Sequence, residues 1–432
     1  MSLDDARELA RSALINGDHA IAVDLGWQIL RLRPDDVDVM LLVATAELER
    51  GHFREARSAA AQAYRDSEDN QIRLKAAQLA ASAALYENRL TLSQLWLRRA
   101  ATNTFAPQDL HRIGTDYLRL RRLNPFSFHF RGQIAPSNNV NNGANGSELI
   151  IDGVPLTGEL SGSAQSLSGI IYVTDAQLKY RIAQSRKGST TLGTRLYAKR
   201  VSLSSEAKRL APGLKEAELG TTYLDFSVAR KILWGTPGNG AGGELSFGRA
   251  WAGESHHYDF VKLNGTRFFR LGDRTQLSFS AAVEERNLNN SFGQDQTLFS
   301  FAAQLSSQLS WGDRVGLSMT VIDVQTEDVN QRSLSTGVYA SYSFAKPWGP
   351  VQISASLAVE QAAYKAYQIG WIAVPGGRKD TLFATDLTFH FKDLTYAGFT
   401  PALRLRAGRR FSNVSRFESD VISMNFEIRS EF

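Results

Sequence analysis

Hydrophobic residues follow two different periods along the chain, one after the other. Residues 1–122 have the spacing of amphipathic helices, with abundant alanine and leucine, interspersed charges and little glycine or proline. Leu123-Asn124-Pro125 ends this pattern. From Phe126 onward apolar and polar residues alternate, as in strands that have one apolar and one polar face. The sequence therefore predicts a helical domain over residues 1–122 and a β domain over residues 123–432.

An internal repeat organises the helical part. Gly17-Asp18-His19 followed by Ala22 recurs 34 residues later as Gly51-His52-Phe53 followed by Ala56, and a weaker third copy runs through residues 88–100. Each unit is expected to be a helical hairpin in which the small alanine lets neighbouring helices approach closely. The period and the glycine ahead of the second helix resemble tetratricopeptide repeats. A generic helical bundle is the alternative.

The β part divides into about fourteen alternating segments, an even number that suits a single-chain bacterial barrel. In one of them Ile170, Tyr172 and Leu178 share a face opposite Asp175 and Lys179. Tight-turn candidates separate some segments, and long polar stretches separate others. The turns are 271–273, 311–313 and 347–349, and the long stretches are 142–166, 204–216, 287–295 and 365–379. Short turns at one end and long loops at the other are typical of a transmembrane β-barrel.

Aromatic residues near the segment ends favour a membrane barrel over a soluble sandwich. A sandwich also alternates, because it buries one face of each sheet. Here, however, the polar face carries charges in nearly every segment, and several segments have the roughly 9–11 residues that a strand needs to cross a bilayer. Such a sheet must close, since an open edge leaves unpaired amides in hydrocarbon. The aromatic residues expected to form interfacial girdles are Tyr172, Tyr180, Trp251, Phe344, Trp348, Phe391 and Phe411.

The last segment, VISMNFEIRSEF (421–432), is expected to close the barrel. Ile422, Met424, Phe426, Ile428 and Phe432 would face lipid, and the charged residues between them would face the lumen. Phe426, Ile428 and the terminal Phe432 resemble the signal that the outer-membrane assembly machinery recognises. The acidic, amphipathic N-terminus is not a signal peptide, so export implies that such a peptide has been removed.

Composition and motifs argue against several functions. The net charge of +5 is spread over 432 residues, so we infer no nucleic-acid partner. The chain contains no cysteine, which excludes disulfides and thiolate metal sites. His256-His257 is the one histidine pair, and neighbours on a strand point to opposite faces. GTPGNGAGG (235–243) precedes a strand and is predicted to be a turn. We expect no catalytic residues, no cofactor and no metal, and hence no enzyme.

Two stretches resemble elements of a known family. IAPSNNVNNG (134–143) is similar to the Asn-rich element that follows the first strand of the surface lipoprotein assembly modulators. RRFSNVSRFESDVISMNFEIRSEF (409–432) is similar to the ending of that family. These proteins join a periplasmic repeat domain to a fourteen-stranded outer-membrane barrel. The present repeat region is briefer and more degenerate.

The resemblance implies an outer-membrane translocator with its repeat domain in the periplasm. Its clients would be surface lipoproteins or secreted haem- and metal-acquisition proteins that carry a small β-barrel domain. Further partners would be a periplasmic chaperone, outer-membrane lipid and the barrel assembly machinery, and the chain would be a monomer. A seam between the first and last strands would allow a client strand to pair there, which we state as a hypothesis.

Candidate contact residues each have a second interpretation. An Asn cluster either meets the client or shapes a turn, because asparagine bonds its own backbone; its members are Asn138, Asn139, Asn141 and Asn142. Five cations expected in the lumen either line a path for an acidic client segment or pair with Glu284, Glu427 and Asp386; they are Lys179, Arg181, Arg270, Arg404 and Arg406. The repeats either bind a client or chaperone in a groove, or cap the barrel.

Three other functions compete with translocation. Polysaccharide export pores also join such repeats to a barrel, although their arrays are generally longer. A diffusive porin with an accessory domain would need an open lumen. A barrel hydrolase is a further class, and no nucleophile motif in the sequence supports it.

Overall fold

The computed structural model of the chain describes residues 2–104, 106–155, 157–289, 294–391, 394 and 399–431. They form two compact units, one helical and one made of strands. The polypeptide passes from one to the other between α7, which ends at Leu123, and β1, which begins at Phe126. Each unit is described by itself.

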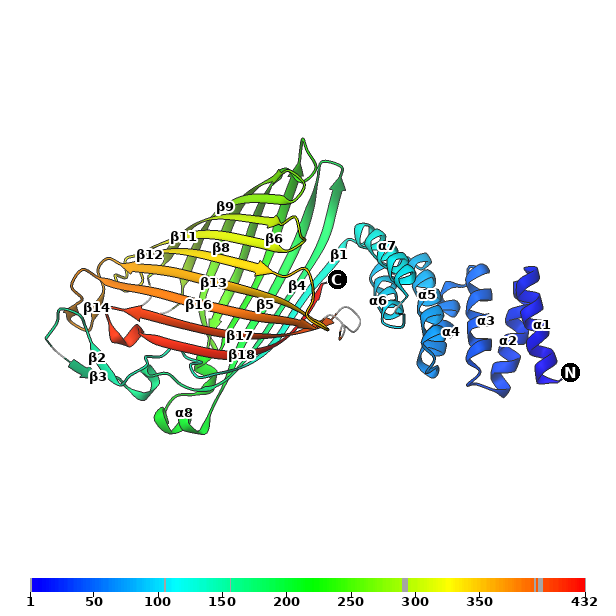
Figure 1. Cartoon of the computed structure of the whole chain (residues 1–432), viewed down its shortest axis with the longest axis horizontal. Coiled ribbons are helices and arrows are strands. Elements are labelled where there is room, and N and C mark those ends of the chain that lie inside the picture. Colours follow the sequence, from blue (N-terminus) through cyan, green and yellow to red (C-terminus); the bar gives the residue numbers. More distant parts are fainter. Residues whose placement is uncertain are drawn as a thin grey trace. The chain divides into compact units, whose positions relative to one another are not determined.

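The helical unit contains seven helices among the described residues (Figure 1). Three helical hairpins follow one another, and a single helix completes the unit. Equivalent helices of the first two hairpins begin 34 residues apart, at Leu3 and Val37 and at His19 and Phe53. The predicted repeat of helical hairpins is confirmed. The helices are α1 (Leu3–Asn16), α2 (His19–Leu32), α3 (Val37–Glu49), α4 (Phe53–Asp66), α5 (Asn70–Tyr86), α6 (Leu90–Ala101) and α7 (Pro107–Leu123).

The turn inside each hairpin uses a left-handed residue. Gly17 and Gly51 have φ of 85° and 79°, a conformation that glycine adopts without steric cost. Asn88 takes the same place in the third hairpin with φ of 59°, and asparagine is the other residue that tolerates this conformation. This replacement explains why the third copy is weak in the sequence. The repeat alanines Ala22 and Ala56 are buried between helices.

One glycine of the helical unit tests the close packing of its helices. A Cβ on Gly26 of α2 would lie 2.3 Å from Cγ2 of the fully buried Val43. We expect Gly26→Leu to lower the free energy of unfolding of this unit by about 1–3 kcal/mol, because overpacking strains a close-packed core. Gly114→Leu in α7 is the matched control, since a Cβ there meets nothing within 4 Å. Thermal unfolding of the full chain, followed by helical circular dichroism, measures both; equal midpoints would contradict the packing described.

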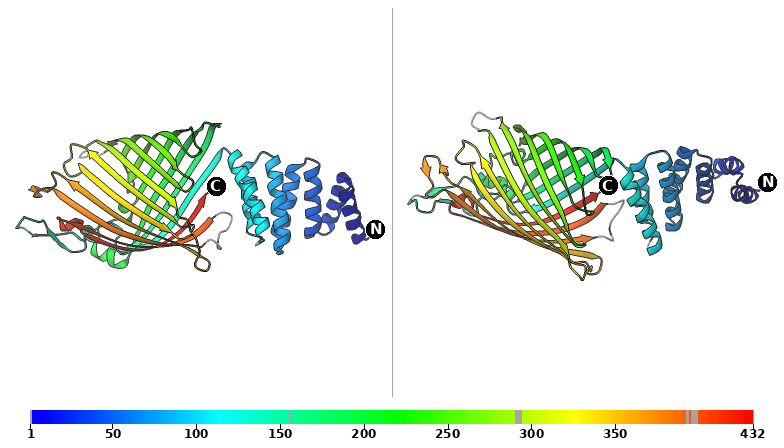
Figure 2. Two further views of the ribbon diagram at one scale, coloured as in Figure 1. Left: turned by 45° about the horizontal axis from the view of Figure 1, so that its top comes forward. Right: turned by 90° about the horizontal axis from the view of Figure 1, so that it is seen from above.

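The second unit is a closed antiparallel barrel in which fourteen strands take part (Figure 1). Sequential strands are neighbours, and β1 and β18 meet to complete the ring. The strands run side by side and strongly tilted in both views of Figure 2. They are β1 (Phe126–Ser137), β4 (Gly169–Ser185), β5 (Gly188–Leu203), β6 (Thr221–Leu233), β7 (Gly240–Ala252), β8 (Ser255–Leu271), β9 (Thr275–Leu288), β10 (Gln296–Gln308), β11 (Arg314–Gln325), β12 (Ser333–Ser343), β13 (Val351–Tyr364), β16 (Arg378–Phe391), β17 (Phe399–Ser412) and β18 (Ser419–Glu431).

Smaller elements occupy the loops. The loop between β1 and β4 contains the hairpin β2 (Glu148–Ile150) and β3 (Thr157–Glu159). The loop between β13 and β16 contains the hairpin β14 (Gln368–Ile369) and β15 (Ile372–Ala373). The short helix α8 (Ser205–Leu210) follows β5. None of the described helices is long and apolar enough to span a membrane.

The predicted short turns and the predicted long loops lie at opposite ends of the barrel, although the short turn Gly253-Glu254 between β7 and β8 lies at the same end as the long loops. The predicted turns at 271–273, 311–313 and 347–349 connect β8–β9, β10–β11 and β12–β13, at the end where β1 begins. Of the segment 235–243, which the sequence predicts to be a turn, residues 235–239 turn between β6 and β7 with positive φ at Gly235 and Gly238, whereas residues 240–243 already belong to β7. The long polar stretches lie at the opposite end, although residue 156 and residues 290–293 fall outside the described part. We call these the turn end and the loop end.

The outer surface of the barrel carries the apolar side chains. Phe426 and Ile428 of β18 are 52% and 50% exposed, while Glu427 between them is buried. The predicted orientation of the closing strand is therefore confirmed for its described residues; Phe432 lies outside them. Direct cross-strand partners share a face, so the outward set extends around the ring through pairs such as Phe226 with Phe247.

Candidate functional site

The junction of β1 and β18 combines regular pairing with an unfavourable charge arrangement. The two strands pair in register from His129 to Ile134 and again at Ser137. Pro136 has no N–H to contribute to a ladder. Arg131 lies directly opposite Arg429 on the lumen side. Like charges in directly opposite positions destabilise a strand pair, so this junction needs compensating groups.

Glu427 supplies one compensation from β18 itself. Its carboxylate is fully buried and accepts a hydrogen bond from Nε of Arg429 at 2.7 Å. It also binds the guanidinium of Arg404 on β17. The lumen side of the junction continues as a polar contact, because Gln133 of β1 donates to Asn425 Oδ1 at 2.7 Å.

Asp175 on β4 supplies the other compensation. Its carboxylate accepts a hydrogen bond from Nε of Arg195 on β5 at 2.9 Å. It lies 3.5 Å from Nη2 of Arg131. Two cation–carboxylate–cation clusters thus flank the junction, one centred on Glu427 and one on Asp175. We call them the junction clusters.

The predicted Asn cluster lies where β1 ends, and its side chains bond the chain's own backbone. Asn138 Oδ1 accepts from the N–H of Ile422 at 2.8 Å, which extends the contact between β1 and β18. Asn139 exchanges two hydrogen bonds with Gly143, at 2.8 and 2.9 Å. These contacts agree with the turn interpretation of the cluster.

The remaining two asparagines hold the same segment in place. Asn141 donates to the carbonyl of Gln165 at 2.8 Å and accepts from the N–H of Leu167 at 3.0 Å. Asn142 has φ of 53°, the left-handed conformation that asparagine tolerates. Val140, which precedes Asn141, is buried in one apolar cluster with Val201 of β5. The segment therefore turns inward at the loop end and packs on the inner wall.

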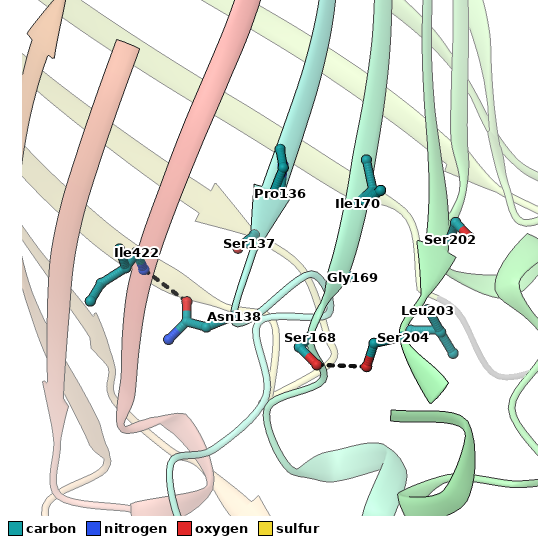
Figure 3. A pocket seen from close by; sticks show the side chains of 10 residues that line it. All are labelled: Pro136, Ser137, Asn138, Ser168, Gly169, Ile170, Ser202, Leu203, Ser204 and Ile422. Atoms are coloured by element: carbon teal, nitrogen blue, oxygen red, sulfur yellow. Dashed lines mark hydrogen bonds between the residues drawn. The ribbon is translucent and has the colours of Figure 1, made fainter. Parts of the chain in front are cut away.

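A pocket of about 480 Å³ opens beside this segment, where β1, β4 and β5 reach the loop end (Figure 3). Two hydrogen bonds join lining residues of the pocket, from the N–H of Ile422 to Asn138 Oδ1 at 2.8 Å and between the hydroxyls of Ser168 and Ser204 at 2.7 Å. The last residues of β1 and the first of β4 both line it. The lining residues are Pro136, Ser137, Asn138, Ser168, Gly169, Ile170, Ser202, Leu203, Ser204 and Ile422.

Three loops pack together at the loop end. Ile151, Val374 and Val414, one from each loop, form a small buried cluster. Arg378 at the start of β16 lies over the ring of Phe417 and pairs with Asp380. A structured collar therefore surrounds part of the mouth.

Burial shifts the titration of two groups in the collar. Loss of solvent raises the pKa of the Tyr367 phenol, and the positive charge of Arg378 opposes part of that increase. Burial also lowers the pKa of the Arg416 guanidinium. Both shifts follow from the close packing of the loops around these side chains.

The five predicted lumen cations occupy different environments. Arg404 belongs to a junction cluster. Arg406 lies opposite Asp386, which accepts a hydrogen bond from the hydroxyl of Ser356 at 3.5 Å. Arg270 bonds the carbonyl of Gly272 at 3.1 Å within its own turn. Lys179 and Arg181 continue the inward row of β4. Of the three carboxylates expected to pair with lumen cations, Glu427 does so and Glu284 does so with Lys262 and Arg286.

Part of the inner wall is unfilled. Ile322 of β11 and Tyr339 of β12 face the lumen by register, yet they are 39% and 43% exposed. Small residues surround them on the same face, including Thr320, Gly337 and Ser341. Among the described residues, the lumen therefore keeps open space along β11 and β12. This part of the inner wall carries uncharged side chains, several of them small, whereas the junction of β1 and β18 carries charged ones.

The sequence reasoning did not single out Arg131 or Arg429. Alternation places both on the polar face of their strands, which is the signal available in the sequence. Their opposition depends on the register between the first and last strands, which a local pattern does not contain. Asp175 and Arg195 were equally hard to select for the same reason.

No protein-family model matches the chain, and no curated relative matches it. Solved structures are similar to its two parts. An outer-membrane channel of Pseudomonas putida F1 (COG4313) is 12% identical, with a TM-score of 0.39, over 72% of this chain and 96% of that one. The TPR2B domain of yeast Sti1, solved as a "TPR2B-domain:pHsp70-complex", is 17% identical, with a TM-score of 0.26, over 28% of this chain and 98% of that one. OccK7 of Pseudomonas aeruginosa is 9% identical, with a TM-score of 0.32, over 71% of this chain and 99% of that one.

Proposed function

We propose that this chain is an outer-membrane translocator that delivers client proteins carrying a small β-barrel domain. One observation carries the proposal. The helical repeat unit ends at Leu123 and the first strand of the barrel, β1, begins at Phe126, so only two residues connect them. This short segment connects a repeat surface that would bind a client to β1, and β1 pairs with β18 at the junction.

The ends of the barrel support an orientation for this activity. Outer-membrane barrels have short periplasmic turns and longer extracellular loops. The turn end of this barrel is also where β1 begins. The helical unit would therefore lie in the periplasm, where it meets clients and chaperones before export. The two motifs that resemble the surface lipoprotein assembly modulators agree with this assignment.

The junction clusters suggest how the barrel would engage a client strand. Separation of β1 from β18 would relieve the opposition of Arg131 and Arg429, while Asp175 and Glu427 remain bound to arginines of their own sides. The exposed edge of β1 would then pair with an edge strand of the client by β-augmentation. Folding of the client outside the cell would supply the driving force, since this mechanism uses no nucleotide.

A diffusive channel is the second candidate, because the lumen beside Ile322 and Tyr339 is open. Conductance of the purified chain in planar bilayers distinguishes the two functions. A steady, large conductance that is indifferent to clients would favour diffusion.

The test of delivery is co-expression in a Gram-negative host with the candidate secreted or lipidated protein encoded at the neighbouring locus. We expect that protein to reach the surface or the medium only when this chain is present. Its failure to appear, with the barrel confirmed as folded in the outer membrane, would overturn the proposal.

A further inference from the structure

Basic residues gather at the turn end of β4–β8 on the outer side of the barrel. Arg230 of β6 belongs to the outward row, because its cross-strand partner Thr190 is two residues from the outward Leu192. Arg267 of β8 lies in the outward row of Leu263. The adjacent turn adds the exposed Arg186 and Lys187. Among the described residues of this outward patch there is no carboxylate.

Aromatic rings fix the guanidinium of Arg267. It lies 4.2 Å from the ring centroid of Trp234 and 4.4 Å from that of Phe269. Its Nη1 donates to the carbonyl of Gly240 at 2.8 Å. Such contacts hold the cation at one position while other N–H groups remain available for an anion. Trp234 is half-exposed, as expected for a residue at a membrane interface.

Small residues leave a shallow depression between the two arginines. In one row across the sheet, Arg230 of β6 lies opposite Gly243 of β7, which in turn lies opposite Gly265 of β8. In the next outward row, closer to the turn end, Ala241 of β7 lies opposite Arg267 of β8. A Cβ added at Gly265 would meet nothing within 4 Å. The depression is therefore open to the outside. Arg267 lies on its β8 side, and Arg230 lies on its β6 side, where Nη1 donates to Oγ1 of Thr190 at 2.7 Å and the other N–H groups remain available. We call it the Arg230–Arg267 saddle.

The surface next to the saddle, toward the loop end, is apolar. Val228, Leu245 and Leu263 form one outward row, and Phe226, Phe247 and Val261 form the next. The rings of Phe226 and Phe247 stack with centroids 5.9 Å apart. A molecule with a phosphate in the saddle could lay hydrocarbon chains along these rows.

We propose that the Arg230–Arg267 saddle binds the headgroup of an anionic glycerophospholipid in the leaflet that borders the turn end. The phosphate accepts hydrogen bonds from both guanidinium groups, and the acyl chains cover the two apolar rows. Charge complementarity and the depth of the site, at the level of Trp234, select this occupant over a neutral lipid. The inference is independent of whether the barrel delivers clients.

Native mass spectrometry of the full chain in detergent, titrated with phosphatidylglycerol or phosphatidylcholine, tests the site. We expect on the order of ten-fold tighter binding of phosphatidylglycerol, since each arginine near a membrane surface contributes to the attraction of anionic lipid. Arg230→Gln with Arg267→Gln should abolish that preference. Gly265→Leu should also abolish it by filling the saddle, without any change of charge.

The matched control is Lys231→Gln with Arg314→Gln, which removes the same charge at the same end but from inward positions. It should keep the preference for phosphatidylglycerol. Equal binding of the two lipids by the unsubstituted chain, or loss of the preference in the control, would overturn the proposal. Tighter binding of lipopolysaccharide or of a polyglutamate peptide, lost in the same saddle variants, would also overturn it by assigning another occupant.

Discussion

A disulfide across the junction of β1 and β18 is expected to abolish client delivery while the barrel stays folded. Ile134→Cys with Phe426→Cys places two thiols on directly opposite, outward positions of the two strands. The chain has no cysteine of its own, so this bond is the one disulfide that oxidation can form. If the edge of β1 must become free to pair with a client strand, a covalent link prevents it. Surface appearance of the co-expressed client, before and after reduction, measures the effect.

The control for this experiment is a second disulfide far from the junction. Leu317→Cys with Ala340→Cys links β11 and β12 at another pair of directly opposite, outward positions. Oxidation of this pair should leave delivery intact, and reduction should restore delivery in the junction variant. Undiminished delivery by the oxidised junction variant would show that β1 and β18 do not separate during transport.

Substitution of Glu427 should have the second largest effect. Glu427→Gln removes the buried carboxylate that binds Arg404 and Arg429, and it leaves the opposition of Arg131 and Arg429 uncompensated on the β18 side. Removal of one partner of a buried ion pair typically costs about 3–5 kcal/mol. We expect faster amide hydrogen exchange in β1 and β18 and a lower temperature of unfolding of the barrel in heat-modifiability gels.

Glu284→Gln is the matched variant for that comparison. Glu284 binds Lys262 and Arg286 in a similar cluster on β8 and β9, remote from the junction in strand order. Its loss should increase exchange in β8 and β9 and leave β1 protected. If both variants loosen the same strands, the junction has no special dependence on its charge clusters.

The sequence predicts most of the fold because its signals are local. Alternation along a strand decides which side chains face outward, and this holds for Phe426 and Ile428. Glycine and polar turn residues mark the ends of strands, so the turn end and the loop end are also predictable. The repeat is visible through Gly17 and Gly51, and it fades where Asn88 replaces glycine with the same backbone conformation.

The candidate site is less predictable because it depends on register and on distant contacts. Arg131 and Arg429 are ordinary polar-face residues until the barrel closes and places them opposite each other. Arg270 lies in the inward row of β8, and its guanidinium bonds within its own turn, since Gly272 and Asp273 lie within reach. The collar joins Ile151, Val374 and Val414 from three loops, and loops of this length carry no periodic signal.

Site-specific photo-crosslinking during delivery tests the central claim most directly. A photo-reactive amino acid at Ile134 or Phe426 reports on the junction, and one at Ile322 or Tyr339 reports on the open lumen wall. We expect crosslinks between the co-expressed client and the junction positions, and these should disappear when delivery is complete. Crosslinks at the lumen positions alone would contradict it, and would indicate that clients pass through the barrel without opening it.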